Sequence, residues 1–268
     1  MLFFKVKKTL AGWLAILALC MPLLAVPSTT EALTATQRPD HITLTWIQDT
    51  RTTQTVTWRT AVGVSEALVQ YGEEVRTGLP LTVDKQVGAD TTELETPEGP
   101  VLLHSATLVG LKPGMRYRYR VGDGSYWSEI HSFRTAPAKA GDFDFLVFGD
   151  SQSTDYEVWR STAAAAGRDT PEAAFFVNVG DLVDAGQDCG EWEAWFAGAA
   201  GLIEKIPAAP VVGNHETYTL ERRRFSLPVF FTSQFRLPAN GPDDLRGQVY
   251  SFDYGEVHFA VLDSQEGE

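Results

Sequence analysis

The spacing of apolar residues changes partway along the chain, and this change restricts the fold more than any other feature. In the first half apolar and polar residues alternate, as in HITLTW at 41–46, which is the period of a half-buried strand. Later, continuous apolar runs such as 143–149 alternate with amphipathic stretches. We therefore expect an all-β domain over residues 36–136, followed by an α/β domain over residues 142–268.

The all-β domain is predicted to be a β-sandwich, because it packs about seven short alternating segments into about 100 residues. In MRYRYRV (115–121) the tyrosines share one face and the arginines face solvent. The stretch LKPGMRYRYRV (111–121) resembles the corner of a fibronectin type III module. The predicted strands lie near 41–48, 53–60, 67–72, 79–84, 103–111, 115–122 and 126–135.

The second domain is predicted to contain a mostly parallel sheet built from βαβ units. Three apolar strands, in FLVFGD, FFVNVGD and APVVGNHE, alternate with segments that have the pattern of helices. The first helix is expected over 155–166, closed by Gly167, and the second over 191–205. QVYSFDYGEVHFAVLD (248–263) predicts a hairpin of two strands around its Gly-Glu pair.

The amino terminus has the layout of an export signal, with lysines at its start and an apolar run from Leu10 to Val26. We predict a signal peptide over 1–32 and a secreted protein, extracellular or periplasmic, with no membrane attachment after cleavage. A retained membrane anchor is the alternative. The formal net charge of −13 argues against nucleic acid as a partner, since that needs a basic face. It does not exclude a small anionic substrate. The sequence does not indicate the oligomeric state.

Three strands of the predicted parallel sheet end in an oxygen-bearing side chain. These are Asp150, Asp181 and Asn214, and each follows a glycine. The carboxyl ends of parallel strands meet at one edge of a sheet, where ligands of open α/β folds bind. Oxygen ligands that converge from separate strands suit divalent metals, and a carboxylate between two ions can bridge them.

The pattern GD…GDxxD…GNHE resembles that of the calcineurin-like metallophosphoesterases, and with a fibronectin-like domain before it the layout is similar to the purple acid phosphatases. The resemblance implies the first half of an α/β sandwich and a centre of two divalent or trivalent ions (Fe, Zn or Mn). Asp150 would bind the first metal, Asp181 would bridge both, and Asn214 would bind the second. The reaction implied is hydrolysis of small phosphate mono- or diesters by a metal-bridging hydroxide.

The resemblance also gives His215 the role of protonating the leaving oxygen, with Asp184 orienting its ring; a turn-capping role for Asp184 is equally open. Glu216 is expected to be structural. Purple acid phosphatases carry a tyrosine where Asp184 stands, and many other relatives carry a histidine where Gln152 stands. Gln152 would be a weak metal ligand, and we expect no purple tyrosinate–iron colour.

The histidine ligands that such enzymes carry beyond GNHE have no counterpart here. The only histidine after His215 is His258, which we interpret as a strand residue. We therefore interpret the chain as a member truncated at its carboxyl end, and expect it to hydrolyse phosphate esters little or not at all by itself. The alternative is a non-catalytic secreted binding protein with a decayed phosphoesterase half.

GDSQS (149–153) also permits a different reading, a GDS-type serine esterase with Ser151 as its nucleophile. Such an enzyme needs a histidine base, usually in a D-x-x-H pattern, and that pattern is absent from the sequence. Without a base the Ser151 hydroxyl is a weak nucleophile. The esterase reading also leaves the second GD pair and GNHE unexplained, so we rank it well below the phosphoesterase.

Overall fold

The structure is a computed structural model, and beyond residue 31 the chain forms one compact unit. The predicted signal peptide (1–32) lies outside the residues that the structure describes. Within the described residues, no helix is both long enough and apolar enough to cross a membrane. The described residues are 35–74, 83–139, 141–221 and 225–265.

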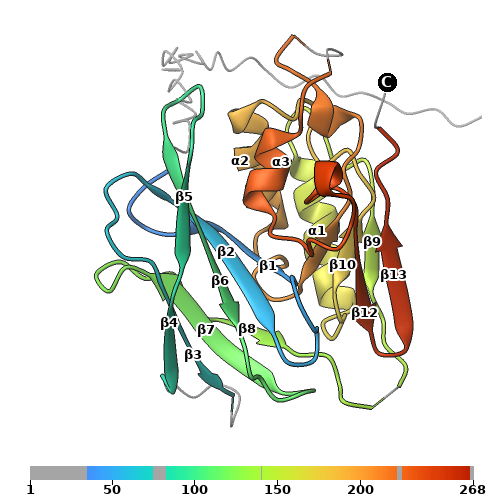
Figure 1. Ribbon diagram of the computed structural model, residues 1–268. Coiled ribbons are helices and arrows are strands. Elements are labelled where there is room, and N and C mark those ends of the chain that lie inside the picture. Colours follow the sequence, from blue (N-terminus) through green and yellow to red (C-terminus); the bar gives the residue numbers. More distant parts are fainter. Residues whose placement is uncertain (1–34, 75–82, 140, 222–224, 266–268) are drawn as a thin grey trace, which may run out of the picture. The chain divides into compact units, whose positions relative to one another are not determined.

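The amino-terminal domain is a β-sandwich of two four-stranded antiparallel sheets, as predicted (Figure 1). Alternate residues of the strands, such as Leu44, Trp58 and Tyr119, are buried and fill the space between the sheets. One sheet has the order β1-β2-β6-β5 and the other β4-β3-β7-β8. The strands are β1 (Asp40–Thr45), β2 (Gln54–Ala61), β3 (Leu68–Glu73), β4 (Lys85–Gly88), β5 (Asp90–Leu94), β6 (Val101–Leu108), β7 (Arg116–Gly122) and β8 (His131–Arg134).

The strand predicted over 79–84 is the main departure in this domain. Residues 79–82 lie outside the described part of the chain, and residues 83 and 84 are not in a strand. Instead β4 pairs with β3 and β5 pairs with β6, so the chain crosses from one sheet to the other around Ala89. The pattern missed β5 because four of its five residues are exposed, which leaves no apolar alternation to detect.

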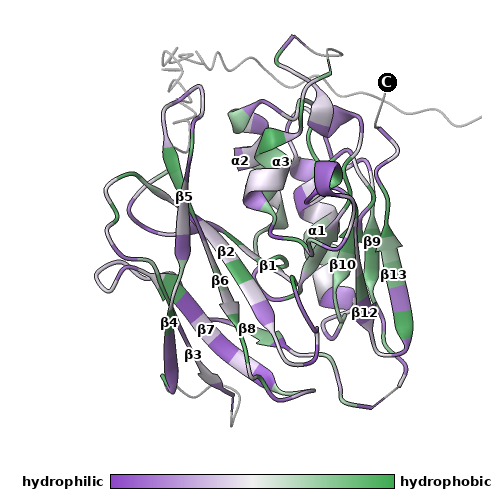
Figure 2. Cartoon of the chain, in the orientation of Figure 1, coloured by the Kyte–Doolittle hydropathy of each residue, from purple (hydrophilic) through white to green (hydrophobic). Residues whose placement is uncertain are grey.

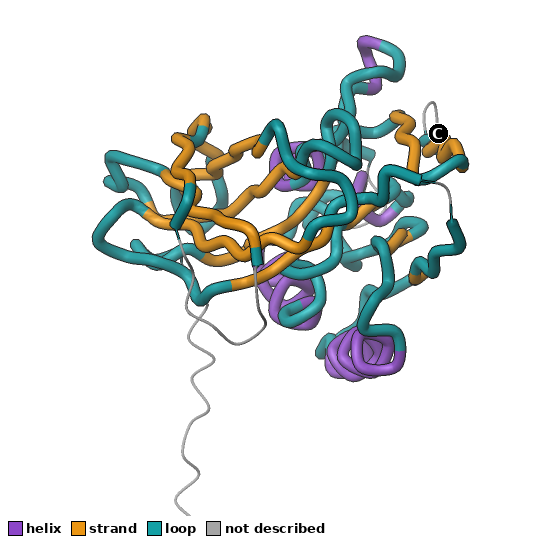
Figure 3. The backbone as a smooth tube through the Cα atoms, turned by 90° about the horizontal axis from the view of Figure 1, so that it is seen from below, coloured by secondary structure: helices purple, strands orange, loops and turns teal. Residues whose placement is uncertain are grey.

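The second domain contains the predicted parallel sheet, with strand order β11-β10-β9. Figures 1 and 2 show β9 and β10 of this sheet side by side. A core cluster rich in aromatic side chains, including Phe175, Trp192 and Trp195, packs around this sheet. The helices of the molecule gather around this domain (Figure 3). Its elements are β9 (Leu146–Phe148), α1 (Glu157–Asp169), β10 (Phe176–Asn178), α2 (Cys189–Ala199), β11 (Ala208–Pro210), α3 (Val229–Gln234), β12 (Tyr250–Tyr254) and β13 (Val257–Val261), with short 3-10 turns at His215–Thr217 and Asp243–Leu245.

The hairpin prediction is confirmed by β12 and β13. The predicted carboxyl ends of both helices were wrong. Helix α1 continues past Gly167 to Asp169. A side chain at Gly167 would begin 3.3 Å from the Leu202 methyl, so this glycine permits close packing and does not end the helix. Helix α2 ends at Ala199, six residues early, because the chain turns at Gly201 with φ of 88°.

Several hydrogen bonds and ion pairs join the sandwich to the α/β domain. The Arg59 guanidinium lies between the carboxylates of Asp40 and Glu193. The buried Tyr119 hydroxyl donates to the main-chain oxygen of Glu204 at 2.8 Å, and the Thr45 hydroxyl to that of Arg236 at 2.6 Å. These contacts fix one face of the α/β domain against the sandwich and leave the carboxyl edge of its sheet to be shaped by its own turns.

Candidate metal-dependent active site

The turns that follow the three parallel strands are joined to one another by hydrogen bonds from main-chain N–H groups. The Asp150 N–H donates to the oxygen of Gly180 at 3.3 Å, which connects the turn after β9 to the turn after β10. The His215 N–H donates to the Asp181 carboxylate at 3.1 Å, which connects the second turn to the third. The structure therefore gathers the turns that carry Asp150, Asp181 and Asn214 at one edge of the sheet, as the strand pattern predicted.

The two aspartates themselves adopt the backbone conformation that makes the turns sharp. Asp150 has φ of 51° and Asp181 has φ of 53°, in the left-handed region that non-glycine residues seldom occupy. Such strain, of order 1–3 kcal/mol per residue, is typical of functional sites. Gly213 is required for a different reason: a side chain there would begin 2.2 Å from the Asp181 carboxylate.

Glu216 joins the turn that carries Asp181 to the turn that carries Asn214. Its side chain is completely buried, and one carboxylate oxygen accepts the N–H groups of Asp181 and Gly213 at 3.0 and 2.7 Å. The other oxygen accepts those of Leu182 and Val183 at 2.7 and 3.3 Å. Burial raises the pKa of this carboxyl to about 7. The structural role expected for Glu216 is thus an anchor for the Asp181 turn.

The His215 ring contacts Asp184, the residue to which the resemblance gives the role of orienting it. Its Nδ1 lies 2.8 Å from the main-chain oxygen of Asp184 and 3.2 Å from the carboxylate of the same residue. Because both partners are acceptors, Nδ1 carries a proton and Nε2 is the atom available to a substrate. The ring of Tyr218 lies 4.7 Å from the imidazole and limits its movement from one side.

A second layer of contacts, which the sequence did not indicate, fixes Asp184 in turn. The Glu191 carboxylate, from the first turn of α2, accepts the N–H groups of Asp184 and Ala185, and also the Tyr156 hydroxyl at 3.2 Å. Burial raises the pKa of Glu191. Tyr156 is itself buried with φ of 55°. No periodic pattern links these three segments. The only signal in the sequence was Glu191 itself, an acidic residue at the start of a predicted helix.

Several side chains at this edge present oxygen atoms to which no described residue donates a hydrogen bond. The Asn214 amide donates its N–H to the Tyr218 hydroxyl at 2.7 Å, which leaves its oxygen free. The buried Gln152 oxygen has no hydrogen-bond partner, and an unpaired buried acceptor is costly unless a ligand satisfies it. With the exposed carboxylate of Asp150, these atoms fit a hard or borderline cation.

The donor set is nevertheless short of charged ligands. Within the described residues, no group of three or more His, Cys, Asp and Glu side chains could hold a metal ion. His258 does not contribute to the site, because it lies on β13 and its Nδ1 pairs with Asp253 at 2.6 Å. It is a strand residue, as expected. The edge thus supplies two carboxylates and two amides, which fit part of a metal centre.

Ser151, the nucleophile of the esterase reading, is a buried structural residue. Its hydroxyl accepts hydrogen bonds from Asn178 at 2.9 Å and from the Trp195 indole at 3.0 Å, and it donates to the Leu182 main chain at 3.3 Å. Its side chain contacts no histidine in these bonds. The serine connects the ends of β9 and β10 to α2, so the geometry gives the esterase reading no support.

Family models match both domains in the order that the fold shows. Residues 143–265 match the calcineurin-like phosphoesterase family, and residues 39–135 match the N-terminal domain of purple acid phosphatases. Together these matches span most of the chain. The second domain therefore matches the calcineurin-like phosphoesterase family, and the chain has the domain order of the purple acid phosphatases.

Curated relatives agree with this assignment. The chain is 27% identical over 191 residues to purple acid phosphatase 23 of Arabidopsis thaliana, covering 60% of this chain and 40% of that protein. It is 25% identical over 243 residues to "Probable inactive purple acid phosphatase 27" of the same plant, covering 79% of this chain and 39% of that protein. The chain thus spans about two fifths of the length of these relatives.

Solved structures show the same fold. The purple acid phosphatase PPD1 from yellow lupin (Lupinus luteus) superimposes with a TM-score of 0.67 at 20% identity, covering 87% of this chain and 46% of that one. PhoD superimposes with a TM-score of 0.56 at 14% identity, over 86% of this chain and 53% of that one. The finer prediction of a fibronectin type III domain within this fold stays a prediction.

Proposed function

We propose that this chain forms part of a secreted, metal-dependent phosphoesterase that acts on small phosphate mono- or diesters. The observation that carries the proposal is the convergence of the Asp150, Asp181 and Asn214 turns, reinforced by the unpaired oxygen of Gln152. The match to the phosphoesterase family supports the reaction class. The apolar leader at 1–32 supports export.

Asp150, Asp181 and Asn214 would hold the metal ions, and Gln152 would add a weak amide ligand. When bound, two such ions (Fe, Zn or Mn) supply Lewis acidity and lower the pKa of a bound water. A cation would also satisfy the acceptors that the described residues leave unpaired.

His215 would donate a proton to the leaving oxygen of the ester. Its Nδ1 proton is directed at Asp184, so any proton transfer to the substrate must take place at Nε2. The Asp184 carboxylate stabilises the charged imidazolium that donates this proton. Glu191 and Glu216 would keep the two partners in place without touching the substrate.

A second candidate, a non-catalytic secreted binding protein, is favoured by two observations. The described residues supply only two carboxylates and two amides to the site, and some relatives carry names that begin "Probable inactive". In such a protein the same turns would keep their shape through Glu216 without a bound metal. Metal content separates the two candidates more directly than turnover does.

The test is equilibrium binding of Mn²⁺ or Zn²⁺ to the purified chain, with 4-nitrophenyl phosphate and bis(4-nitrophenyl) phosphate as substrates. We expect measurable metal binding that Asp181→Asn weakens about tenfold or more, because a charged ligand is lost. Turnover by this chain should be low. Asp169→Asn, an exposed aspartate at the end of α1, is the matched control. Metal binding that is absent, or unaffected by Asp181→Asn, would support the binding protein instead.

A further inference from the structure

A cavity of about 400 Å³ lies between the sandwich and the α/β domain, remote from the candidate metal edge. Its lining comes from β7 and β8 on one side, and from the end of α1 and the loops before β10 and β11 on the other. Since those loops enter the strands that Asp181 and Asn214 follow, the cavity lies at the opposite, amino edge of the parallel sheet. Its volume falls in the range of small-ligand sites, about 300–1,000 Å³.

The cavity collects positive charge in a strongly acidic protein. Its lining holds four cationic side chains and one carboxylate, whereas the whole chain carries a formal charge of −13. The cations come from four separate segments and so are not a consequence of one basic run. They are Arg116 on β7, Arg134 on β8, Arg168 in the last turn of α1, and Lys205 before β11.

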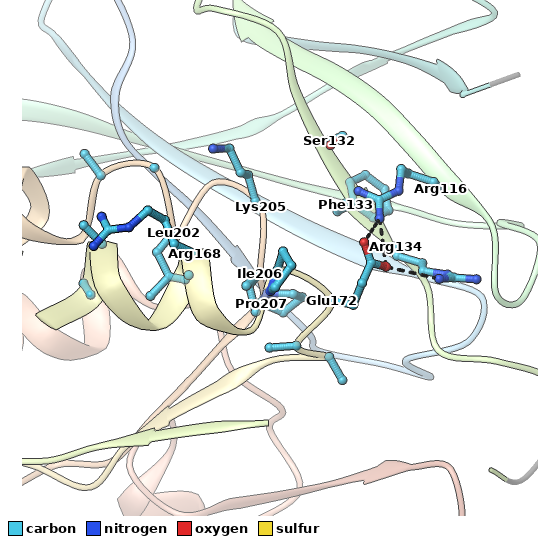
Figure 4. A pocket seen from close by; sticks show the side chains of 18 of the residues that line it. Arg116, Ser132, Phe133, Arg134, Arg168, Glu172, Leu202, Lys205, Ile206 and Pro207 are labelled. Carbon is cyan, nitrogen blue, oxygen red and sulfur yellow. Dashed lines mark hydrogen bonds and ion pairs between the residues drawn. The ribbon is translucent and has the colours of Figure 1, made fainter. Parts of the chain in front are cut away.

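Two of these cations, Arg116 and Arg134, form ion pairs with a carboxylate of the lining. The Glu172 carboxylate accepts hydrogen bonds from Arg116 at 2.9 and 3.1 Å and pairs with Arg134 at 3.4 Å. Figure 4 shows this cluster on one side of Ile206 and Pro207, with Arg168 and Lys205 on the other. Among the described residues, no carboxylate lies within 4.0 Å of Arg168 or Lys205. The neighbouring Glu204 carboxylate accepts the Gly201 N–H and interacts with the Lys205 charge over a distance longer than an ion pair.

Ordinary structural roles account for only part of this arrangement. An exposed ion-pair cluster can join two domains, which accounts for Arg116 and Arg134. A cation in the last turn of a helix complements the helix dipole, which accounts for Arg168. Neither role explains Lys205 or the open volume beside it. The wall formed by α1 and the following loops includes six small residues, Ala163, Ala164, Gly167, Ala173, Ala200 and Gly201. These leave space that larger apolar residues would fill.

We propose that this cavity binds a small organic anion that carries a tetrahedral dianionic group such as phosphate. The lining carries three more positive than negative charges, and Glu74, outside the lining, offsets one of them by pairing with Arg116 at 3.8 Å. The remaining excess suits a dianion better than a carboxylate. Arginine forks match tetrahedral oxyanions, and lysine adds a point charge. Phe133, Leu202 and Tyr254 supply an apolar and aromatic wall for the organic part.

The test is calorimetric titration of phenylphosphonate, which contains no hydrolysable ester, into the chain after treatment with a chelating resin. Without metal the candidate active site does not compete, so the outcome is independent of the proposed hydrolysis. We expect saturable binding that weakens with added salt. The double variant Arg168→Gln/Lys205→Gln should raise Kd about tenfold or more, because two charged partners are lost. Both side chains are exposed, so folding should be unaffected.

Two further variants keep the result interpretable. Arg160→Gln removes an exposed arginine from the same helix outside the cavity and should leave Kd unchanged. Ala164→Trp fills the cavity from an exposed position and should abolish binding without removing a charge. Absence of saturable binding, or an equal Kd in the double variant, would overturn the proposal. If inorganic phosphate binds as tightly as phenylphosphonate, the organic part of the assignment is wrong. If benzoate binds as tightly, the dianionic part is wrong.

Discussion

Replacing Glu216 by glutamine tests whether one buried carboxylate shapes the candidate site. The glutamate accepts four main-chain N–H groups, two on each oxygen. Glutamine keeps the size but turns one oxygen into an NH₂ group, which cannot accept hydrogen bonds from its two N–H neighbours. Two buried donors then lose their partner, at about 1–3 kcal/mol each.

An opposing effect reduces this loss. Burial raises the pKa of Glu216 from its ordinary value of 4.5 to about 7, so the buried charge carries a penalty of about 3 kcal/mol that glutamine avoids in part. We therefore expect Glu216→Gln to lower the free energy of unfolding by about 1–4 kcal/mol near neutral pH.

Urea denaturation of the chain, followed by tryptophan fluorescence, measures this difference, provided that the dependence of the free energy of unfolding on urea concentration is the same in both chains. Glu157→Gln is the control: this exposed glutamate on α1 makes a surface pair with Arg160 and should change stability by about 0.5 kcal/mol or less. A Glu216→Gln chain as stable as this control would refute the reasoning that the turns depend on the carboxylate.

Three other predictions follow from the contacts described above. Ser151→Ala should cost about 1–3 kcal/mol in urea denaturation, because it leaves the buried Asn178 amide and Trp195 indole without an acceptor; labelling of wild-type Ser151 by a serine-directed phosphonate would contradict its structural role. Asp188→Ala should cost about 1 kcal/mol, since the side chain caps α2 through the N–H groups of Gly190 and Glu191; an unchanged unfolding midpoint would argue against the cap. Burial lowers the pKa of His104 to about 4, so the unfolded chain binds a proton that the folded chain does not between pH 6.5 and about 4. The free energy of unfolding should therefore fall by up to about 3 kcal/mol as the pH decreases through that window, and His104→Gln should reduce the slope of this pH dependence.

The sequence was informative where a residue's environment follows from its neighbours along the chain. Alternation predicted the sandwich because strands such as β7 bury every second residue. Continuous apolar runs ending in Gly-Asp predicted both β9 and β10 and the edge at which Asp150 and Asp181 lie. These features are local, so one sequence was enough to find them.

Features that depend on contacts between distant segments could not be predicted in this way. Gly167 has the appearance of a helix terminator, yet α1 continues through it, and the nearby Leu202 explains why a glycine stands there. The Glu191 contacts with the Asp184 turn and with Tyr156 join residues from three separate elements. Edge strand β5 lacks an apolar face and depends on pairing with β6.

The left-handed backbone at Asp150 and Asp181 limits which substitutions this chain can accept. Apart from glycine, asparagine and aspartate enter that conformation most easily, so Asp→Asn would remove a charge while preserving the turn. Alanine would remove the carboxylate and also favour a different turn. A descendant with asparagine at both positions would keep the shape of the two turns and lose the carboxylates on which the proposed metal site depends.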